Sequence, residues 1–262
     1  MTADMSPIDT AKYVAAKRSV DFVEDGMRVG LGTGSTAAFM VRALGDLVRE
    51  EGLRIRGVPT STRTAELAHA QGIEVVTLDE ARWLDVTIDG ADEVDGNLDL
   101  IKGGGGALLQ EKIVAAASDR MVVIADLAKE VGRLGAFPLP VEVIPFGWHT
   151  TRALVEELLI NMDVLGRDAV LRSTGDRPFV TDEGNYILDL HLARITDAHR
   201  LSMALNQVPG VVENGLFLDM CDVLILGHGD GRVEIRDITA GTVEQDRLDV
   251  METDNLFTDL SD

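Results

Sequence analysis

One stretch of the sequence constrains the fold more than any other. Residues 89–111 (DGADEVDGNLDLIKGGGGALLQE) join an acidic cluster to four consecutive glycines. The preceding residues 83–88 (WLDVTI) are typical of a buried strand, and residues 107–117 (ALLQEKIVAAA) carry apolar side chains at helical spacing. The acidic residues therefore follow a strand, and the glycines precede a helix. Ligands bind at this edge of open α/β sheets, so the segment is the first candidate for a functional site.

Strands and helices alternate over the first half of the chain. Apolar runs predict strands at residues 27–31, 53–60, 73–78 and 120–126. Helical spacing predicts helices at residues 10–24, 37–50 and 63–71. This alternation predicts an α/β fold built on a doubly wound, mostly parallel sheet of the Rossmann-like type.

The pattern changes after Gly135, where residues 137–148 (FPLPVEVIPFGW) contain three prolines and indicate a domain junction. The following segments have the order β-α-β-β-α-β, which predicts a second, smaller ferredoxin-like α+β domain over residues 132–207. Its last strand, within residues 211–217, fits either domain. The apolar run at 221–229 predicts a strand that returns to the first sheet. The Rossmann-like domain would thus comprise residues 1–131 and 208–241, followed by an acidic, solvated or partly disordered tail, 242–262.

Composition disfavours several classes of protein. The formal net charge of −21, from 45 acidic and 24 basic residues, argues against nucleic-acid binding, because such a surface repels phosphate backbones. No run of about 18 apolar residues indicates a membrane span, and no basic segment before an apolar one indicates a secretory signal. Cys221 is the only cysteine, so a disulfide within the chain is impossible. We expect a cytoplasmic protein, and we hypothesise that its acidic surface suits high salt.

A second glycine-rich turn, GTGSTA (residues 32–37), follows the strand at 27–31 and precedes a helix. Glycines let the backbone approach an anion, and the amides and dipole of the helix favour negative charge, so the turn could hold a small phosphate. It has neither the P-loop spacing nor the dinucleotide-binding pattern. Ser35 or Thr36 could instead be an ordinary N-cap, and the residue types alone leave both interpretations open.

The acidic cluster also has interpretations that involve no catalysis. In so acidic a protein it fits a solvated loop, and a carboxylate-rich loop also suits magnesium or calcium. Four glycines alone fit a flexible turn, and Glu111 and Lys129 alone fit surface residues. The histidines show no metal-ligand spacing, so we assign no metal site and none of them to catalysis: His69, His149, His191, His199 and His228.

Five motifs in order favour a specific interpretation. Together they resemble the ribose-5-phosphate isomerases of the A type over most of the chain: GLGTGSTA (30–37), DGADEVD (89–95), KGGGGALLQEK (102–112), IADLAK (124–129) and FPLPVEVIPF (137–146). The resemblance implies that D-ribose 5-phosphate and D-ribulose 5-phosphate are interconverted, in the non-oxidative pentose phosphate pathway, without a metal or organic cofactor. It also implies a homodimer or homotetramer.

The same resemblance implies roles for individual residues. Glu111 matches the catalytic base, and three further residues match the reacting end of the sugar: Asp89, Asp92 and Lys102. The positions that match substrate-binding residues are Lys12, Thr33, Gly34, Ser35, Thr36, Asp89, Gly90, Ala91, Asp92, Lys102, Gly103, Gly104, Gly105 and Lys129.

These residue types suit the isomerisation of an aldose to a ketose. One carboxylate can carry a proton between C2 and C1 on a single face of an enediolate, and Glu111 would be that base. Lys102 and the amides of residues 103–106 would stabilise the developing oxyanion. Asp89 or Asp92 would act on hydroxyl protons and help to open the furanose ring.

Two alternatives belong to other classes of protein. A non-catalytic sugar-phosphate sensor on the same fold would need a DNA-binding module, and the chain has neither a spare helix-turn-helix segment nor a basic face. A CoA-transferase-like enzyme could use Glu111 as a nucleophile. It would leave the lysines and the hydroxyls of the phosphate turn unexplained.

Overall fold

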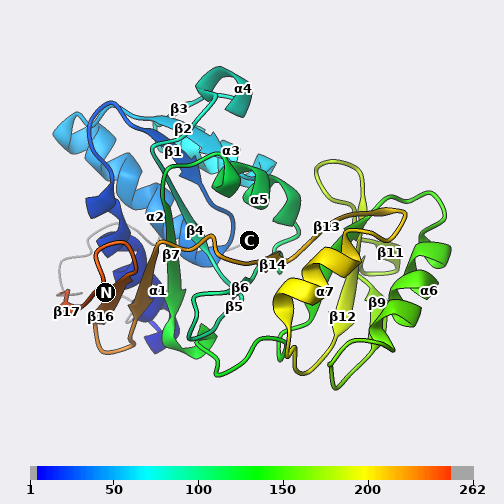
Figure 1. Ribbon diagram of the computed structural model, residues 1–262. Coiled ribbons are helices and arrows are strands. Elements are labelled where there is room, and N and C mark those ends of the chain that lie inside the picture. Colours follow the sequence, from blue (N-terminus) through cyan, green and yellow to red (C-terminus); the bar gives the residue numbers. More distant parts are fainter. Residues whose placement is uncertain (1–4, 249–262) are drawn as a thin grey trace.

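A sheet of eight strands organises the molecule. The computed structural model describes residues 5–248, and the strands of its largest sheet lie in the order β17-β16-β15-β7-β4-β1-β2-β3 (Figure 1). Their bounds are β1 Arg28–Leu31, β2 Arg56–Pro59, β3 Glu74–Val75, β4 Val86–Gly90, β7 Met121–Asp126, β15 Val223–Gly227, β16 Arg232–Asp237 and β17 Thr242–Arg247. From β3 to β15 every neighbouring pair is parallel, while β16 and β17 pair antiparallel. The predicted doubly wound, mostly parallel sheet is confirmed.

The strand order explains where a ligand can bind. The parallel strands follow the chain in the order 3-2-1-4-5-6, so the winding direction reverses between β1 and β4. At such a reversal the segments that follow the two strands diverge and leave a crevice at their carboxyl ends. The glycine-rich turn follows β1, and the acidic stretch begins at the end of β4. The topology therefore brings two distant sequence motifs to one edge of the sheet.

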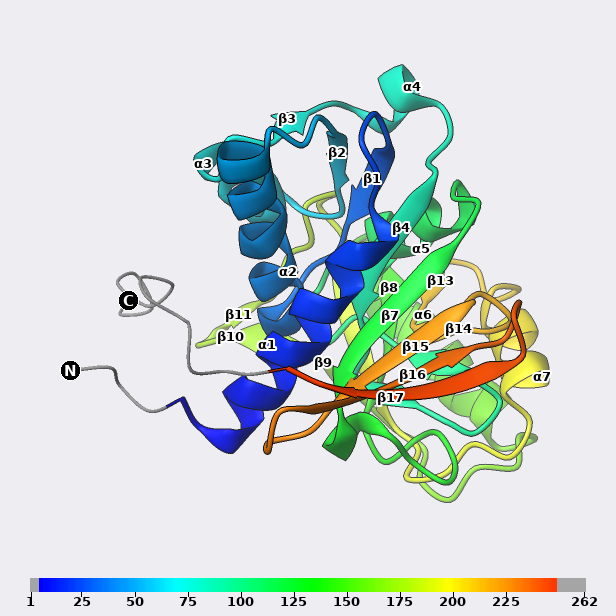
Figure 2. The ribbon, with the colours of Figure 1, turned by 90° about the vertical axis from the view of Figure 1, so that its left-hand side faces the viewer.

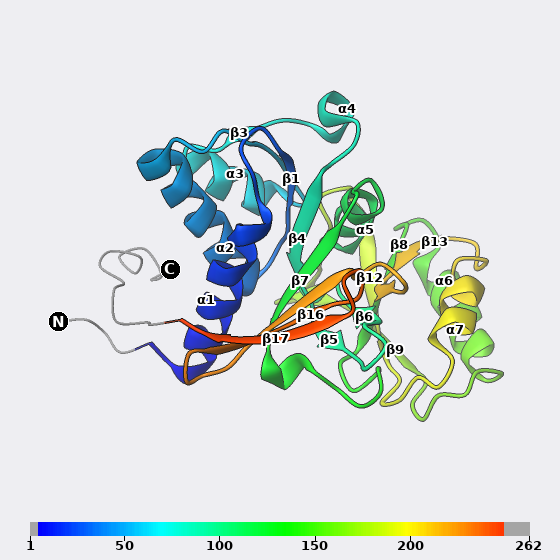
Figure 3. The ribbon, with the colours of Figure 1, turned by 60° about the vertical axis from the view of Figure 1, so that its left-hand side comes forward.

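Helices cover both faces of this sheet. α1 (Pro7–Ser19) and α2 (Ser35–Asp46) pack on the face turned toward the viewer in Figure 2, over buried side chains such as Val29, Ile88 and Ile124. α5 (Leu108–Ala116) lies on the other face, as Figure 3 shows. The remaining helical segments of this part are η1 Val20–Phe22, η2 Leu47–Glu51, α3 Thr62–Ala70, α4 Leu78–Ala81 and η3 Leu127–Lys129.

A smaller antiparallel sheet forms the second part of the molecule, beside the first in Figure 1. Its elements are β8 Leu139–Val143, α6 Trp148–Leu159, β9 Asp168–Leu171, β12 Tyr186–His191, α7 Ala198–Leu205 and β13 Val211–Asn214, with a hairpin, β10 Ser173–Thr174 and β11 Arg177–Pro178, between β9 and β12. The strand order β13-β8-β12-β9 is that of the ferredoxin-like fold, as predicted. A separate core of buried apolar residues, including Val141, Val155 and Leu188, supports it.

A third sheet, which the sequence did not indicate, connects the two parts. It consists of β5 Glu93–Val94, β6 Leu100–Ile101 and β14 Leu216–Phe217. The Lys102 N–H continues it by donating to Gly215 O at 2.9 Å. β14 falls within the strand predicted at residues 211–217, whereas β5 and β6 were not predicted, because strands of two residues have no periodicity that a sequence pattern could indicate. They hold the segment between the acidic cluster and the glycines in place.

Two boundaries differ from those expected. β13 pairs with β8, so residues 211–214, which fitted either domain and lie within the segment 208–241 assigned to the Rossmann-like domain, belong to the small sheet. Residues 242–247 of the expected tail form the exposed edge strand β17, paired with β16. Residues 249–262 of the tail lie outside the described residues. No helix within residues 5–248 is long and apolar enough to cross a membrane.

Candidate active site

Lys102 lies at the centre of the site, directly after β6. Its side chain is only 2% exposed, and its Nζ lies 3.0 Å from Asp89 Oδ2 and 3.2 Å from Glu111 Oε1. The Nζ also donates a hydrogen bond of 2.5 Å to Gly90 O. A buried ammonium group is costly unless it is paired and hydrogen-bonded, so these three oxygens explain why the lysine can be buried here.

Asp89 connects Lys102 to the glycine-rich turn that follows β1 (residues 32–37). It lies near the end of β4 with its side chain fully buried, and its Oδ1 accepts hydrogen bonds from the N–H groups of Thr33 and Gly90, at 3.1 and 2.7 Å. The end of β1 approaches it so closely that a Cβ on Gly32 would lie 2.2 Å from Asp89 Oδ1. Only glycine at position 32 therefore permits this contact.

Glu111 lies in the first turn of α5 and is only 4% exposed. Its Oε1 faces Lys102, and its buried Oε2 has no hydrogen-bond partner among the residues that the structure describes. Burial raises the pKa of Glu111 to about 8, against the opposing effect of Lys102, and the charge of Asp89 adds to the rise. A carboxyl group with a pKa near neutrality can both accept and return a proton at physiological pH.

The three charged groups determine one another's ionisation. Burial raises the pKa of Asp89, and the Lys102 ammonium opposes that rise. Burial alone would lower the pKa of Lys102, but the carboxylates of Asp89 and Glu111 hold it above its ordinary value. Lys102 therefore stays charged, and the two carboxyl groups titrate as a coupled pair around it.

The turn after β1 leaves the start of α2 open. Gly34, with a φ of +115°, is the N-cap residue, and no side chain within residues 5–248 caps this helix. The N-cap interpretation of Ser35 and Thr36 is wrong, because both lie inside α2. The first N–H groups of a helix have no partner within it, and the helix dipole makes their surroundings positive. An uncapped glycine turn is thus suited to bind an anion.

A cluster of hydroxyl groups holds the turn after β1 in place through Thr33. Thr33 Oγ1 lies 2.8 Å from Thr60 Oγ1, 2.8 Å from Ser61 Oγ and 3.1 Å from Thr64 Oγ1. All three partners come from the end of β2 and the start of α3. The hydroxyl-rich segment 60–64 therefore supports the glycine-rich turn by binding the side chain of Thr33.

The four glycines form an ordered loop. Gly103 and Gly106 have φ angles of +100° and +83°, and the Gly106 N–H donates to Gly103 O at 3.0 Å. The Gly104 N–H donates to Asp92 Oδ2 at 2.7 Å. This hydrogen bond holds the Asp92 side chain against the glycine loop. Asp92 is therefore ordered at the pocket and is not part of a freely solvated loop.

One pocket collects the residues that the sequence singled out. It is lined by Lys12, Thr33, Gly34, Ser35, Thr36, Gly90, Ala91, Asp92, Lys102, Gly103, Gly104, Gly105, Glu111 and Lys129. Asp89 is fully buried next to it, in contact with Lys102. Lys12 reaches the pocket from α1 and Lys129 from η3.

Sequence reasoning missed Arg172, which directly follows β9 of the small sheet. Arg172 contacts the glycine loop, 69 residues away in the sequence, and no motif surrounds it.

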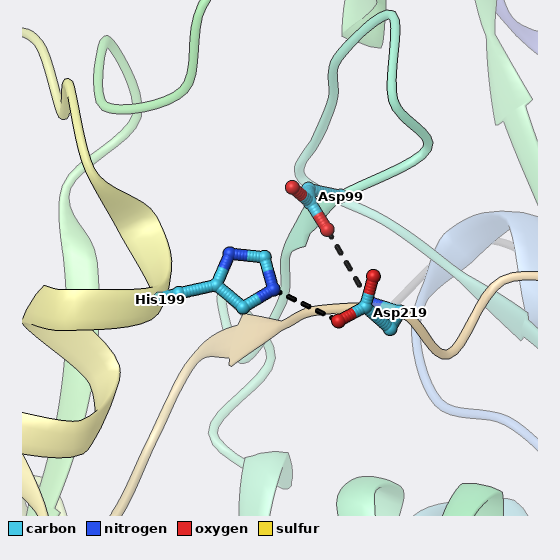
Figure 4. Close-up of side chains that lie close together, drawn as sticks. All are labelled: Asp99, His199 and Asp219. Atoms are coloured by element: carbon cyan, nitrogen blue, oxygen red, sulfur yellow. Dashed lines mark hydrogen bonds and ion pairs between the residues drawn. The ribbon is translucent and has the colours of Figure 1, made fainter.

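A separate group of potential metal ligands lies between the two parts of the molecule (Figure 4). His199 Nε2 lies 2.8 Å from Asp219 Oδ2, and the Asp219 N–H donates to Asp99 Oδ1 at 3.3 Å. The hydrogen bond that His199 donates to Asp219 raises the pKa of His199, and nearby carboxylates add to this rise. A protonated His199 pairs with these carboxylates without a metal, so we assign no ion to the group.

Comparison with known proteins points to the same family as the five sequence motifs. The family model for ribose 5-phosphate isomerase A (phosphoriboisomerase A) matches residues 56–231. The ribose-5-phosphate isomerase A of Ruegeria pomeroyi is 77% identical over 262 residues, and that of Jannaschia sp. is 70% identical, each with 100% of both chains covered.

Solved structures give the same result. A D-ribose-5-phosphate isomerase in complex with phospho-erythronic acid is 40% identical, with a TM-score of 0.78 over 90% of this chain and 97% of that one. Ribose 5-phosphate isomerase A from Neisseria gonorrhoeae is 43% identical, with a TM-score of 0.77 over 88% and 97% of the two chains.

Proposed function

The chain belongs to the ribose-5-phosphate isomerase A family, and from this premise we propose that Glu111 is the base of its reaction. The enzyme interconverts D-ribose 5-phosphate and D-ribulose 5-phosphate, a step of the non-oxidative pentose phosphate pathway. The sensor and CoA-transferase-like alternatives are therefore wrong. The following paragraphs concern the roles of individual residues.

Glu111 would move one proton along one face of the sugar. In the aldose-to-ketose direction its carboxylate removes the C2 proton, the electron pair forms the C1–C2 double bond, and the C1 carbonyl oxygen becomes an oxyanion. O1 then takes up a proton while O2 loses one, and the negative charge moves to O2. As the C2 carbonyl forms, Glu111 returns its proton to C1. The observation that carries this assignment is the unpartnered Oε2 of a buried carboxyl group.

Lys102 and the glycine loop would stabilise the enediolate. The ammonium group is buried and charged, and fixed donors of this kind act strongly on charge that develops in a water-poor site. Asp89 holds this lysine in place and orients the turn that binds phosphate. Asp92, which accepts from the Gly104 N–H, would exchange protons with the sugar hydroxyls and assist ring opening.

The phosphate group would bind at the N-terminus of α2. The N–H groups of residues 34–36 and the two lysines at the pocket, Lys12 and Lys129, supply positive charge in a protein whose net charge is −21. The relative in complex with phospho-erythronic acid binds a ligand with a phosphate at one end and a carboxylate at the other. We expect the same ligand to bind here as a mimic of the enediolate.

Replacement of Glu111 by glutamine tests the base. Glu111→Gln should lower kcat by a factor of about 100 to 10,000, the usual contribution of a general base, while phospho-erythronic acid still binds. Assays in EDTA keep metal ions out of the measurement. Turnover close to that of the unaltered enzyme would contradict the assignment.

We propose further that the enzyme acts in the cytoplasm, as a homodimer or homotetramer, and that its acidic surface suits high salt. A lone buried cysteine, Cys221, fits a reducing compartment. Exposed apolar side chains such as Phe146 and Ile160, 88% and 65% exposed, fit contacts between subunits. Light scattering tests the oligomer, which a monomer at every salt concentration would exclude. Equal unfolding temperatures in dilute and molar salt would exclude the adaptation to salt.

A further inference from the structure

Arg172 reaches from the small sheet to the glycine loop of the active site. It directly follows β9, and its side chain is only 16% exposed. One guanidinium nitrogen, Nη1, donates to Gly103 O at 2.9 Å and to Gly104 O at 3.1 Å. The other two, Nε and Nη2, bind both oxygens of Asp189 on β12, at 2.9 and 2.5 Å. Every nitrogen of the guanidinium group is thus engaged.

These contacts fix two successive peptide planes. In a trans peptide the C=O and the following N–H point in opposite directions, and the described chain contains no cis peptide. The carbonyl of Gly103 faces Arg172, so the Gly104 N–H points away from it, and that N–H donates to Asp92 at 2.7 Å. The same geometry applied to the next plane turns the Gly105 N–H away from Arg172. Gly105 lines the pocket, and its N–H has no protein acceptor within residues 5–248.

The arrangement is specific for arginine. A planar guanidinium group can bind a carboxylate with one edge and two carbonyls with the remaining nitrogen, whereas an ammonium group is a single point with no fixed directions. Asp189 holds the guanidinium group of Arg172 in one orientation. Phe179, whose N–H donates to Arg172 O at 2.9 Å, packs against the same loop, since a Cβ on Gly106 would lie 2.4 Å from its ring. The small sheet therefore forms a rigid support for the glycine loop.

We propose that Arg172 is a positioning residue for the isomerisation: it orients the glycine loop so that the Gly104 N–H holds Asp92 and the Gly105 N–H faces the enediolate. A charged donor on a carbonyl also polarises the peptide and strengthens its N–H as a donor. The proposal rests on the proposed function, in which the glycine amides stabilise the oxyanion. It gives the small domain a direct part in the reaction, although none of its described residues lines the pocket.

Arg172→Gln and Arg172→Lys test the proposal, with Arg194→Gln as the matched control. Arg194 is another arginine of the small domain, paired with Asp163 at 3.0 Å and absent from the pocket. We expect kcat to fall about 10- to 100-fold in Arg172→Gln, because a misplaced donor loses most of its effect on the transition state. Arg172→Lys should recover little, and Arg194→Gln should keep kcat within about twofold.

Two inhibitors separate positioning from a general loss of structure. Phospho-erythronic acid presents a carboxylate to the oxyanion donors, whereas inorganic phosphate needs only the turn at α2 and the two lysines beside it, Lys12 and Lys129. Arg172→Gln should weaken the first about tenfold or more and leave the second unchanged. Equal weakening of both, or unaltered kcat and inhibition, would overturn the proposal. If Arg172→Gln does not fold, Asp189→Asn, which frees the guanidinium from its anchor, should shift the same ratio of inhibition constants.

Failure of this proposal is distinguishable from failure of the proposed base. The ratio of the two inhibition constants does not depend on proton transfer, so it can be measured in Glu111→Gln as well. A normal ratio in Arg172→Gln would overturn the role of Arg172 alone. Full turnover in Glu111→Gln would overturn the base and leave the measured ratio as it is.

Discussion

Lys102 and Glu111 lie nine residues apart in the sequence, and their side chains meet in a buried ion pair with Nζ 3.2 Å from Oε1. The pair leaves Oε2 of Glu111 without a partner among the described residues. One oxygen of the carboxyl group is thus held while the other is available to a substrate. Because Lys102 also pairs with Asp89, any change in one of these three groups alters the charge of the others.

The pH dependence follows from the pKa of Glu111, which burial raises to about 8. The base must be ionised to accept the C2 proton, so lowering the pH through that value protonates it and removes activity. We expect kcat/KM to rise about tenfold per pH unit below about pH 8 and to level off above it. Initial rates from about pH 6 to about pH 10 measure this, and a flat profile over that range would contradict the ionisation state assigned here.

Lys102→Met should make stability depend more steeply on pH than it does in the unaltered enzyme, in which the raised pKa values of Glu111 and Asp89 already lower stability as the pH rises. Without the ammonium group, two buried carboxyl groups face each other, and removing one partner of a buried ion pair costs about 3–5 kcal/mol. Both carboxyl groups would then have pKa values raised above those of the unfolded chain. The folded state would bind more protons, so its stability would be lost as the pH rises through those raised values.

Urea unfolding at about pH 6 and about pH 8 measures this effect. The free energy of unfolding should fall more between these two pH values in Lys102→Met than in the unaltered enzyme. The double variant Lys102→Met/Glu111→Gln should recover part of the loss, because only one buried carboxyl group remains. If both variants unfold at the same urea concentration at both pH values, the charge balance described here is wrong.

Gly32→Ala tests the close approach between β1 and Asp89. The added Cβ would lie 2.2 Å from Asp89 Oδ1 and 2.6 Å from its Cα, so the backbone has to move. We expect a loss of about 1–3 kcal/mol in the free energy of unfolding and a fall in kcat of about 100-fold, since the contact orders both the turn and Lys102. Gly96→Ala is the control, because a Cβ added there would have no atom within 4 Å. Equal effects of the two substitutions would contradict the steric argument.

The sequence predicted the parts of this fold that depend on local patterns. Buried parallel strands such as β7 are continuous apolar runs, and the motifs at residues 32–37 and 102–106 are contiguous, so both were recognisable. β17 was missed because its side chains are all exposed and it is held by backbone pairing with β16. Arg172 was missed because strand pairing, which no local pattern specifies, brings it to a loop 69 residues away.

Lys12→Gln tests the proposed contact between Lys12 and the phosphate group of the substrate. Lys12 lines the pocket from α1, and Lys17 lies on the same helix outside the pocket, so Lys17→Gln is a control with the same change of charge. A charge-assisted contact with phosphate contributes about 1.5–3 kcal/mol, which corresponds to a factor of about 10 to 100 in binding. Lys12→Gln should raise KM for ribose 5-phosphate and the inhibition constant of inorganic phosphate by that factor. The value of kcat should change little, because this contact is the same in the ground state and in the transition state. If both lysine variants raise KM equally, a general effect of charge explains the result, and Lys12 does not bind the phosphate.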